Sequence, residues 1–136
     1  MTATNNPAVA PARASIGPAV QAGGRAEWDE ALAAYRTAKT NLDTFDARYI
    51  NTPKELPIGP ARSAYVDSIP RSAWAESERL AEIMYDAEER LMPIPAPDAI
   101  AFAAKFLVAR GEGRTADGYD HLLEAEAARL LREAMA

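Results

Sequence analysis

The chain has 136 residues, of which 49% are apolar and 26% charged, a balance typical of one soluble globular domain. It contains no cysteine, which excludes disulfides, thiolate catalysis and zinc–thiolate sites and is compatible with a cytoplasmic location. The net charge of −5 and the scattered basic residues argue against direct nucleic-acid binding, which requires clustered Lys and Arg side chains.

Residues 1–25 have the composition of a disordered tail. They are rich in Ala, Pro and Gly and contain neither acidic nor aromatic residues. Such a segment buries too little apolar surface to offset the entropy lost on ordering. We therefore predict a disordered tail over 1–25 and a single helical domain over 26–136.

The segment 26–50 has the periodicity of an amphipathic helix. Its larger apolar residues recur at steps of three and four, which places them on one stripe: Trp28, Leu32, Tyr35, Ala38, Leu42, Phe45 and Tyr49. The prolines and the glycine that follow, up to Pro70, predict a connecting loop. Within this loop, 61–67 is compatible with a short helical turn that packs Tyr65 and Val66 against the core, although so short a helix is not stable alone.

A second long helix is expected over 70–91, with Ser68 or Ser72 as alternative N-caps. Apolar and small residues at alternating steps of four and three predict a seam that packs alongside another helix: Ala73, Ser77, Leu80, Met84, Ala87 and Leu91. The outer face is acidic, and a solvated face is its ordinary interpretation. Two aromatic residues lie just off the seam, where exposure would indicate a partner site. The candidate partner contacts are Trp74, Tyr85, Glu78, Glu82, Asp86 and Glu89.

Three alternating prolines, Pro93, Pro95 and Pro97, predict an extended elbow after this helix, because proline lacks the amide donor and its ring clashes with the preceding turn. Asp98 is placed to cap a third helix over 98–110. The apolar arc of that helix is wide and predicts burial on more than one side: Ile100, Phe102, Ala103, Phe106, Leu107 and Val108.

A last helix is expected over 118–134, with Asp117 as a plausible N-cap. Its stripe consists of Tyr119, Leu122, Leu123, Glu126, Leu130 and Ala134. In total, the sequence predicts an all-α, up-and-down bundle of three to four helices.

No motif indicates catalysis. His121 is the single histidine; it could act as a general base beside Asp117 or Glu124, but a surface histidine is the ordinary case. The glycines around 111–118 lack the preceding strand of a phosphate loop, and the carboxylates at 78–89 lack the histidines of a di-metal bundle. We expect no enzymatic activity, no cofactor and no metal. No apolar run approaches the roughly 18 residues that cross a bilayer, so we expect no membrane contact.

The elbow Pro95-Ala96-Pro97-Asp98 follows a first helix that begins with Trp28, Ala31, Leu32 and Tyr35, and Lys105 lies downstream. This arrangement resembles a pattern in small uncharacterised alphaproteobacterial proteins that are often found near prophage genes. The resemblance covers 26–108. It implies helix, helix, elbow and helix in that order, and it implies no activity and no catalytic residue.

The sequence thus favours a non-enzymatic protein-interaction or small structural module, phage-associated and oligomeric, whose partner is another protein or a second copy of the chain. The alternative is an acidic inhibitor. In that interpretation the glutamate-rich helix over 70–91 mimics the charge of a nucleic acid and blocks the basic cleft of an enzyme.

Overall fold

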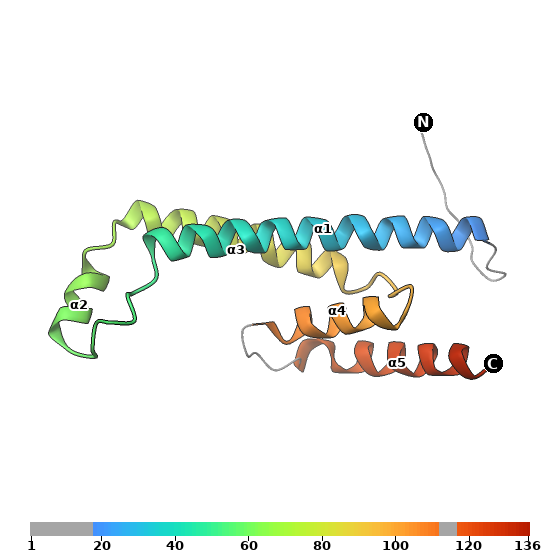
Figure 1. Ribbon diagram of the computed structural model, residues 1–136. Helices are drawn as coiled ribbons and strands as arrows, with labels where there is room; N and C mark the ends of the chain where they lie inside the picture. The colour runs from blue at the N-terminus through green and yellow to red at the C-terminus, as the bar shows by residue number, and fades with distance from the viewer. Residues whose placement is uncertain (1–17, 112–116) are drawn as a thin grey trace, which may run out of the picture.

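The computed structural model describes residues 18–111 and 117–136, and every regular element among them is helical (Figure 1). The elements are α1 (Pro18–Tyr49), α2 (Pro60–Asp67), α3 (Arg71–Leu91), α4 (Ala99–Ala109), the short 3₁₀ turn η2 (Asp117–Tyr119) and α5 (Asp120–Met135). The predicted all-α class is confirmed. Two antiparallel hairpins make up the fold, a long one of α1 and α3 and a shorter one of α4 and α5 (Figure 1).

The long hairpin is built from the two apolar stripes that the sequence predicts. On α1 the buried residues include Trp28, Tyr35, Ala38 and Leu42, and on α3 they include Met84, Ala87 and Leu91. Near the far end, the Ser77 hydroxyl donates a hydrogen bond of 2.7 Å to Asp46 Oδ1 and joins the two helices. The α1 stripe ends less buried than expected, since Tyr49 is 47% exposed and its ring packs on Phe45 at 4.8 Å.

The first helix begins at Pro18 instead of residue 26, so the part of the predicted tail from 18 to 25 is helical. Polar contacts are present at Arg25, ahead of Trp28, the first buried residue of the stripe. The Arg25 guanidinium lies 2.5 Å from Asp98 Oδ2 and 3.9 Å from Asp29 Oδ1. Residues 1–17 of the predicted tail lie outside the described residues.

The short helix in the connecting loop is confirmed, but its predicted packing is wrong. No residue of α2 is buried, and Val66 is 39% exposed. Polar contacts to its own loop hold α2 instead: Arg62 Nε donates to the Leu56 carbonyl at 3.0 Å, and the Tyr65 hydroxyl donates to the Asn51 carbonyl at 3.3 Å. Gly59 precedes the helix at φ 145°, a conformation that L-residues with a side chain rarely adopt.

Neither serine caps α3. Its N-cap is Pro70, which offers no side-chain hydrogen bond. The Ser68 hydroxyl donates to the Tyr65 carbonyl at 2.6 Å, so it serves the end of α2 instead. Ser72 lies inside the first turn of α3, because the helix begins at Arg71, two residues earlier than a cap at Ser72 would place it.

The proline elbow separates α3 from α4 as predicted, and it is partly buried: Met92 and Ala96 are 1% and 0% exposed. Asp98 caps α4, its Oδ1 accepting a hydrogen bond of 2.8 Å from the Ala101 amide. The predicted cap of α5 is not found, since Tyr119 occupies the N-cap position without a side-chain hydrogen bond. The Tyr119 hydroxyl instead donates to Glu88 Oε2 at 3.0 Å and connects the start of α5 to α3.

Candidate functional site

A buried lysine joins α4 to three other parts of the chain. Lys105 is the single charged residue of α4 and has no exposed surface. Its Nζ lies 2.7 Å from Glu126 Oε1 on α5, donates to the Ile94 carbonyl in the elbow, and lies 5.4 Å from the ring centroid of Trp28 on α1. The inner side of α4 is therefore held by an ion pair, a hydrogen bond and a cation–π contact.

The same cluster binds the elbow backbone to α5. The Ala96 amide donates to Glu126 Oε2 at 3.1 Å, and the Ala96 carbonyl accepts a hydrogen bond of 2.8 Å from Arg129. A buried peptide group without partners is costly, so these two contacts allow Ala96 to be fully buried. Arg129 also pairs with Glu133 at 2.9 Å along the exposed side of α5.

The environment of Lys105 favours a structural role over a catalytic one. Burial lowers the pKa of the Lys105 ammonium, and the hydrogen bond and charge of Glu126 offset part of that shift. The contact with Glu126 Oε1 is a close ion pair of 2.7 Å between two side chains that are 0% and 9% exposed. The Lys105 ammonium is therefore enclosed by the elements that it joins.

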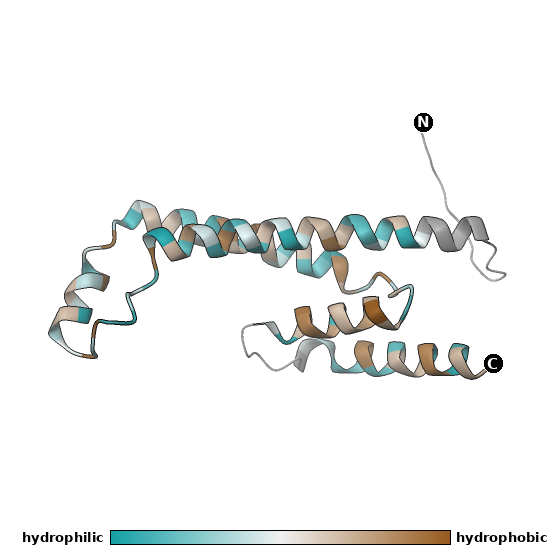
Figure 2. Ribbon diagram, viewed as in Figure 1, coloured by the Kyte–Doolittle hydropathy of each residue, from teal (hydrophilic) through white to brown (hydrophobic). Residues whose placement is uncertain are grey.

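The opposite side of α4 faces solvent. Ile100 is 82%, Leu107 70% and Phe106 40% exposed. We define the α4 face as the exposed residues of this helix and its cap: Ala99, Ile100, Ala103, Phe106, Leu107 and Arg110. At the helical rotation of about 100° per residue, they lie within an arc of about 120°. Figure 2 shows α4 as a predominantly hydrophobic helix between the α1–α3 hairpin and α5.

This exposure contradicts the prediction that the apolar arc of α4 is buried on more than one side. Among the predicted residues, Val108 is buried and Phe102 is partly buried, whereas Ile100, Ala103, Phe106 and Leu107 are exposed. The physical reason is that α4 lies between the α1–α3 hairpin and α5 (Figure 1), which cover its inner side and leave the outer arc open to solvent.

The predicted partner contacts on α3 are all exposed. Trp74 and Tyr85 are 42% and 44% exposed, and the four carboxylates of Glu78, Glu82, Asp86 and Glu89 also lie at the surface. At about 100° per residue, all six fall within about 120° of the helix circumference. The structure thus brings them onto one outer face of α3, which we call the acidic α3 face. That a partner binds there stays a prediction.

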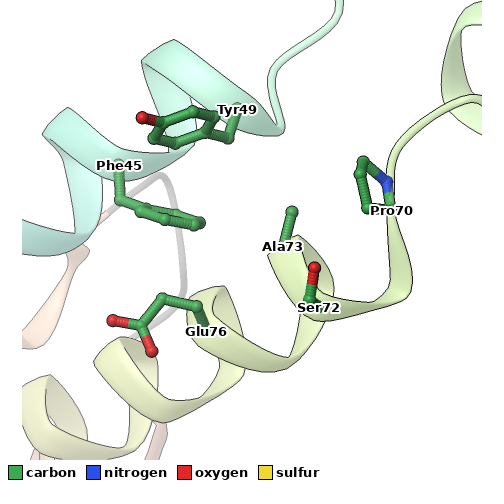
Figure 3. A pocket seen from close by; sticks show the side chains of 6 residues that line it. All are labelled: Phe45, Tyr49, Pro70, Ser72, Ala73 and Glu76. Atoms are coloured by element: carbon green, nitrogen blue, oxygen red, sulfur yellow. The ribbon is translucent and has the colours of Figure 1, made fainter.

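A shallow cleft of about 350 Å³ lies between the end of α1 and the start of α3 (Figure 3). Its lining consists of Phe45, Tyr49, Pro70, Ser72, Ala73 and Glu76. The Glu76 carboxylate is paired with Arg79 at 2.7 Å. The cleft therefore lacks the convergent polar groups that orient a small ligand.

The remaining candidates for chemistry are not assembled into a site. His121 is exposed on α5, as is Glu124, and the side chain of Asp117 lies outside the described residues. Among the residues that the structure describes, no three His, Asp or Glu side chains are grouped to hold a metal ion. No helix in the described ranges combines the length and hydropathy needed to cross a membrane.

Comparison with known proteins adds no relative: no family model, curated protein or solved structure matches this chain. The resemblance to alphaproteobacterial proteins stays a prediction. Sequence reasoning missed the cluster of Lys105, Glu126 and Arg129. Its signals were a lone lysine in an apolar helix and a glutamate on an apolar stripe.

Proposed function

We propose that the protein is a non-enzymatic interaction module that binds a protein partner through the α4 face. The observation that supports this proposal is the joint exposure of Ile100, Phe106 and Leu107 on one arc of a helix. Single exposed apolar residues are ordinary on protein surfaces. A contiguous group on one helix face is typical of an interaction site.

The composition of the face supports the same proposal. Phe106 and Arg110 belong to residue types enriched at interfaces, and they lie together, with the Arg110 guanidinium carbon 5.7 Å from the Phe106 ring centroid. Along the helix, Ala103 separates Ile100 from the adjacent pair of Phe106 and Leu107. These features provide an aromatic anchor, two aliphatic anchors and a cation at the rim.

The attachment of α4 lowers the entropic cost of binding. Asp98 caps the helix, Lys105 holds its inner side, and Ala96 fixes the elbow that precedes it. A surface that is already ordered before association loses less conformational entropy on binding. The face is thus presented in a defined conformation.

Photo-crosslinking in cells that express the protein tests the proposal. A benzoyl-phenylalanine residue at position 103, in the centre of the α4 face, is expected to form adducts with a protein partner. The matched control carries the same residue at position 58, because Ile58 is 95% exposed but lies in the loop before α2. Adduct formation at 103 that does not exceed the level at 58 contradicts the proposal.

The acidic α3 face supports a second candidate, the acidic inhibitor. Its four carboxylates are exposed on one arc and would attract a basic cleft at long range. If a lysate is irradiated in about 0.5 M salt, where charge interactions are screened within a few ångströms, the benzoyl-phenylalanine at position 82 is expected to form no adducts. Adduct formation should also be lost when Glu78, Asp86 and Glu89 are replaced by Gln. Adducts that still form under both conditions contradict this candidate.

A further inference from the structure

We infer that the partner of the α4 face is a second copy of this chain, packed α4 against α4 in antiparallel orientation about a two-fold axis. The inference depends on the proposed function, because it names the partner of the same surface. Charge, shape and direction each support it.

Charge favours this face over the remaining surface. The chain has a net charge of −5, so two copies repel one another through most of their surfaces. The α4 face contains no carboxylate, and Arg110 is its single charged residue. Two copies that meet through α4 therefore bring together apolar groups without juxtaposing their acidic side chains.

The shape of the face matches its own two-fold image. Ile100 and Leu107 are seven residues apart, which corresponds to about 10 Å along the helix, and the small Ala103 lies between them. In an antiparallel arrangement centred near Ala103, each Ile100 packs on Leu107 of the second copy. The alanines at the centre allow the two helices to approach closely while the large residues fill both ends.

The charge at the end of α4 selects the antiparallel direction. Arg110 is the single charged residue of the face and lies at the C-terminal end of the helix. The register that pairs Ile100 with Leu107 places the two Arg110 guanidinium groups at opposite ends of the contact, where they do not repel one another. A parallel arrangement would oppose like charges and like helix ends. The antiparallel contact is isologous, so it closes as a dimer and does not extend into a filament.

Sedimentation equilibrium of the purified chain tests the association. We expect a monomer–dimer equilibrium, and we expect Ile100→Glu/Leu107→Glu to weaken it at least tenfold by placing four carboxylates at the contact. Ile58→Glu is the matched control and should behave as the wild type. Because Ile100 and Leu107 are exposed, the double variant should retain the wild-type circular dichroism and urea midpoint at a concentration low enough for the wild type to be monomeric, which separates lost contact from lost fold.

Cysteine crosslinking tests the geometry, and the cysteine-free sequence makes it unambiguous. Mild oxidation of Ala103→Cys should give disulfide-linked dimers, whereas Ile58→Cys should not. A mixture of Ile100→Cys and Leu107→Cys chains should form mixed dimers faster than either variant forms dimers alone. Faster self-pairing of each variant would overturn the antiparallel arrangement.

The outcomes distinguish this inference from the proposed function. The inference is overturned if the chain stays monomeric at about 1 mM, because a dissociation constant of 1 mM corresponds to only about 4 kcal/mol of binding free energy. It is also overturned if the Ile100→Glu/Leu107→Glu variant dimerises as readily as the wild type. In-cell adducts from position 103 to a different protein, with none to the chain itself, also overturn it but support the proposed function. An absence of adducts above the position-58 control contradicts the proposed function.

Discussion

Lys105 on α4 and Glu126 on α5 form an ion pair of 2.7 Å whose two side chains are 0% and 9% exposed. Taking both charges out of water is unfavourable unless each is well paired. The Ile94 carbonyl, the Ala96 amide and the Trp28 ring supply the additional contacts. The pair therefore joins α4 to α5 within the hairpin, and the additional contacts attach that hairpin to the elbow and to α1.

Replacing Glu126 by Gln should destabilise the protein strongly. Gln can still accept the hydrogen bond of the Ala96 amide, but it leaves the buried ammonium without an opposite charge, which costs about 3–5 kcal/mol of unfolding free energy. Urea denaturation followed by circular dichroism measures the loss. Glu133→Gln is the control; it removes a pair with Arg129 in which Glu133 is 59% exposed, and should cost less than about 1 kcal/mol. Equal effects of the two substitutions would contradict the importance of the buried pair.

Removing the charge of Lys105 as well should recover stability. In Lys105→Met/Glu126→Gln the methionine fills a similar volume and no unpaired charge remains in the interior. We expect this double variant to be more stable than Glu126→Gln alone. The comparison forms part of a double-mutant cycle, and a double variant less stable than the single one would show that the loss arises from packing.

The stability of the protein should rise with pH through the titration of Lys105. Its folded-state pKa is lowered by burial, whereas the unfolded chain has the ordinary value of 10.5. Between these two values the unfolded state binds more protons than the folded state, so the unfolding free energy increases with pH. Below the folded-state pKa, both states are protonated and the contribution is constant.

The measurement compares urea midpoints of the wild type and Lys105→Met/Glu126→Gln from about pH 8 towards pH 10.5, since the other titrating groups are shared and cancel. The wild type should gain stability relative to the double variant over this range. If the urea midpoint of the wild type stays constant or falls relative to that of the double variant as the pH rises, the pKa of Lys105 is not lowered.

The two tryptophans should report different parts of the unfolding reaction. Trp28 is 2% exposed and Trp74 is 42% exposed. The variant Trp74→Phe keeps only the buried Trp28, so its fluorescence emission should shift strongly to the red in urea. The variant Trp28→Phe keeps only the exposed Trp74, so its emission should shift only slightly. Trp28→Ala should cost about 3–5 kcal/mol because it leaves a cavity and removes a contact of Lys105. Trp74→Ala is the matched control and should have a small effect. Similar red shifts in the two Phe variants would contradict the burial of Trp28.

Asp98 should contribute mainly as the cap of α4. Asn can accept the hydrogen bond of the Ala101 amide, whereas Ala cannot, and both substitutions remove the exposed ion pair with Arg25. We therefore expect the urea midpoint to fall from the wild type to Asp98→Asn and again to Asp98→Ala, and the decrease from Asn to Ala should be larger than the decrease from the wild type to Asn. A larger step at asparagine would show that the charge of Asp98 is more important than its capping.

The parts of the fold that the sequence predicts well are those that depend on local periodicity. The stripe from Trp28 to Leu42 and the seam from Met84 to Leu91 are each legible within one helix, and the prolines between 93 and 97 prevent helix regardless of tertiary contacts. The start of α1 at Pro18 was less predictable. It is accompanied by an ion pair between Arg25 and a residue far along the chain.

The candidate site was harder to predict, because the outer side of α4 has the same residue types as a core. An apolar arc such as Ile100 to Leu107 indicates burial, but it does not show whether the covering surface belongs to the same chain. The pairing of Lys105 with Glu126 requires the relative position of two helices, which no spacing within one helix provides. The acidic α3 face was predictable, since charge opposite an apolar seam is exposed by default.

The contact between Lys105 and Trp28 connects α4 to the first long helix of the fold, 77 residues earlier in the sequence. A nascent or truncated polypeptide without its final helix lacks Glu126, and one without its first helix lacks the indole above the ammonium. Each fragment thus loses a contact that holds the inner side of α4. We therefore expect the ordered outer face of α4 to require both α1 and α5, although neither helix contributes a residue to that face.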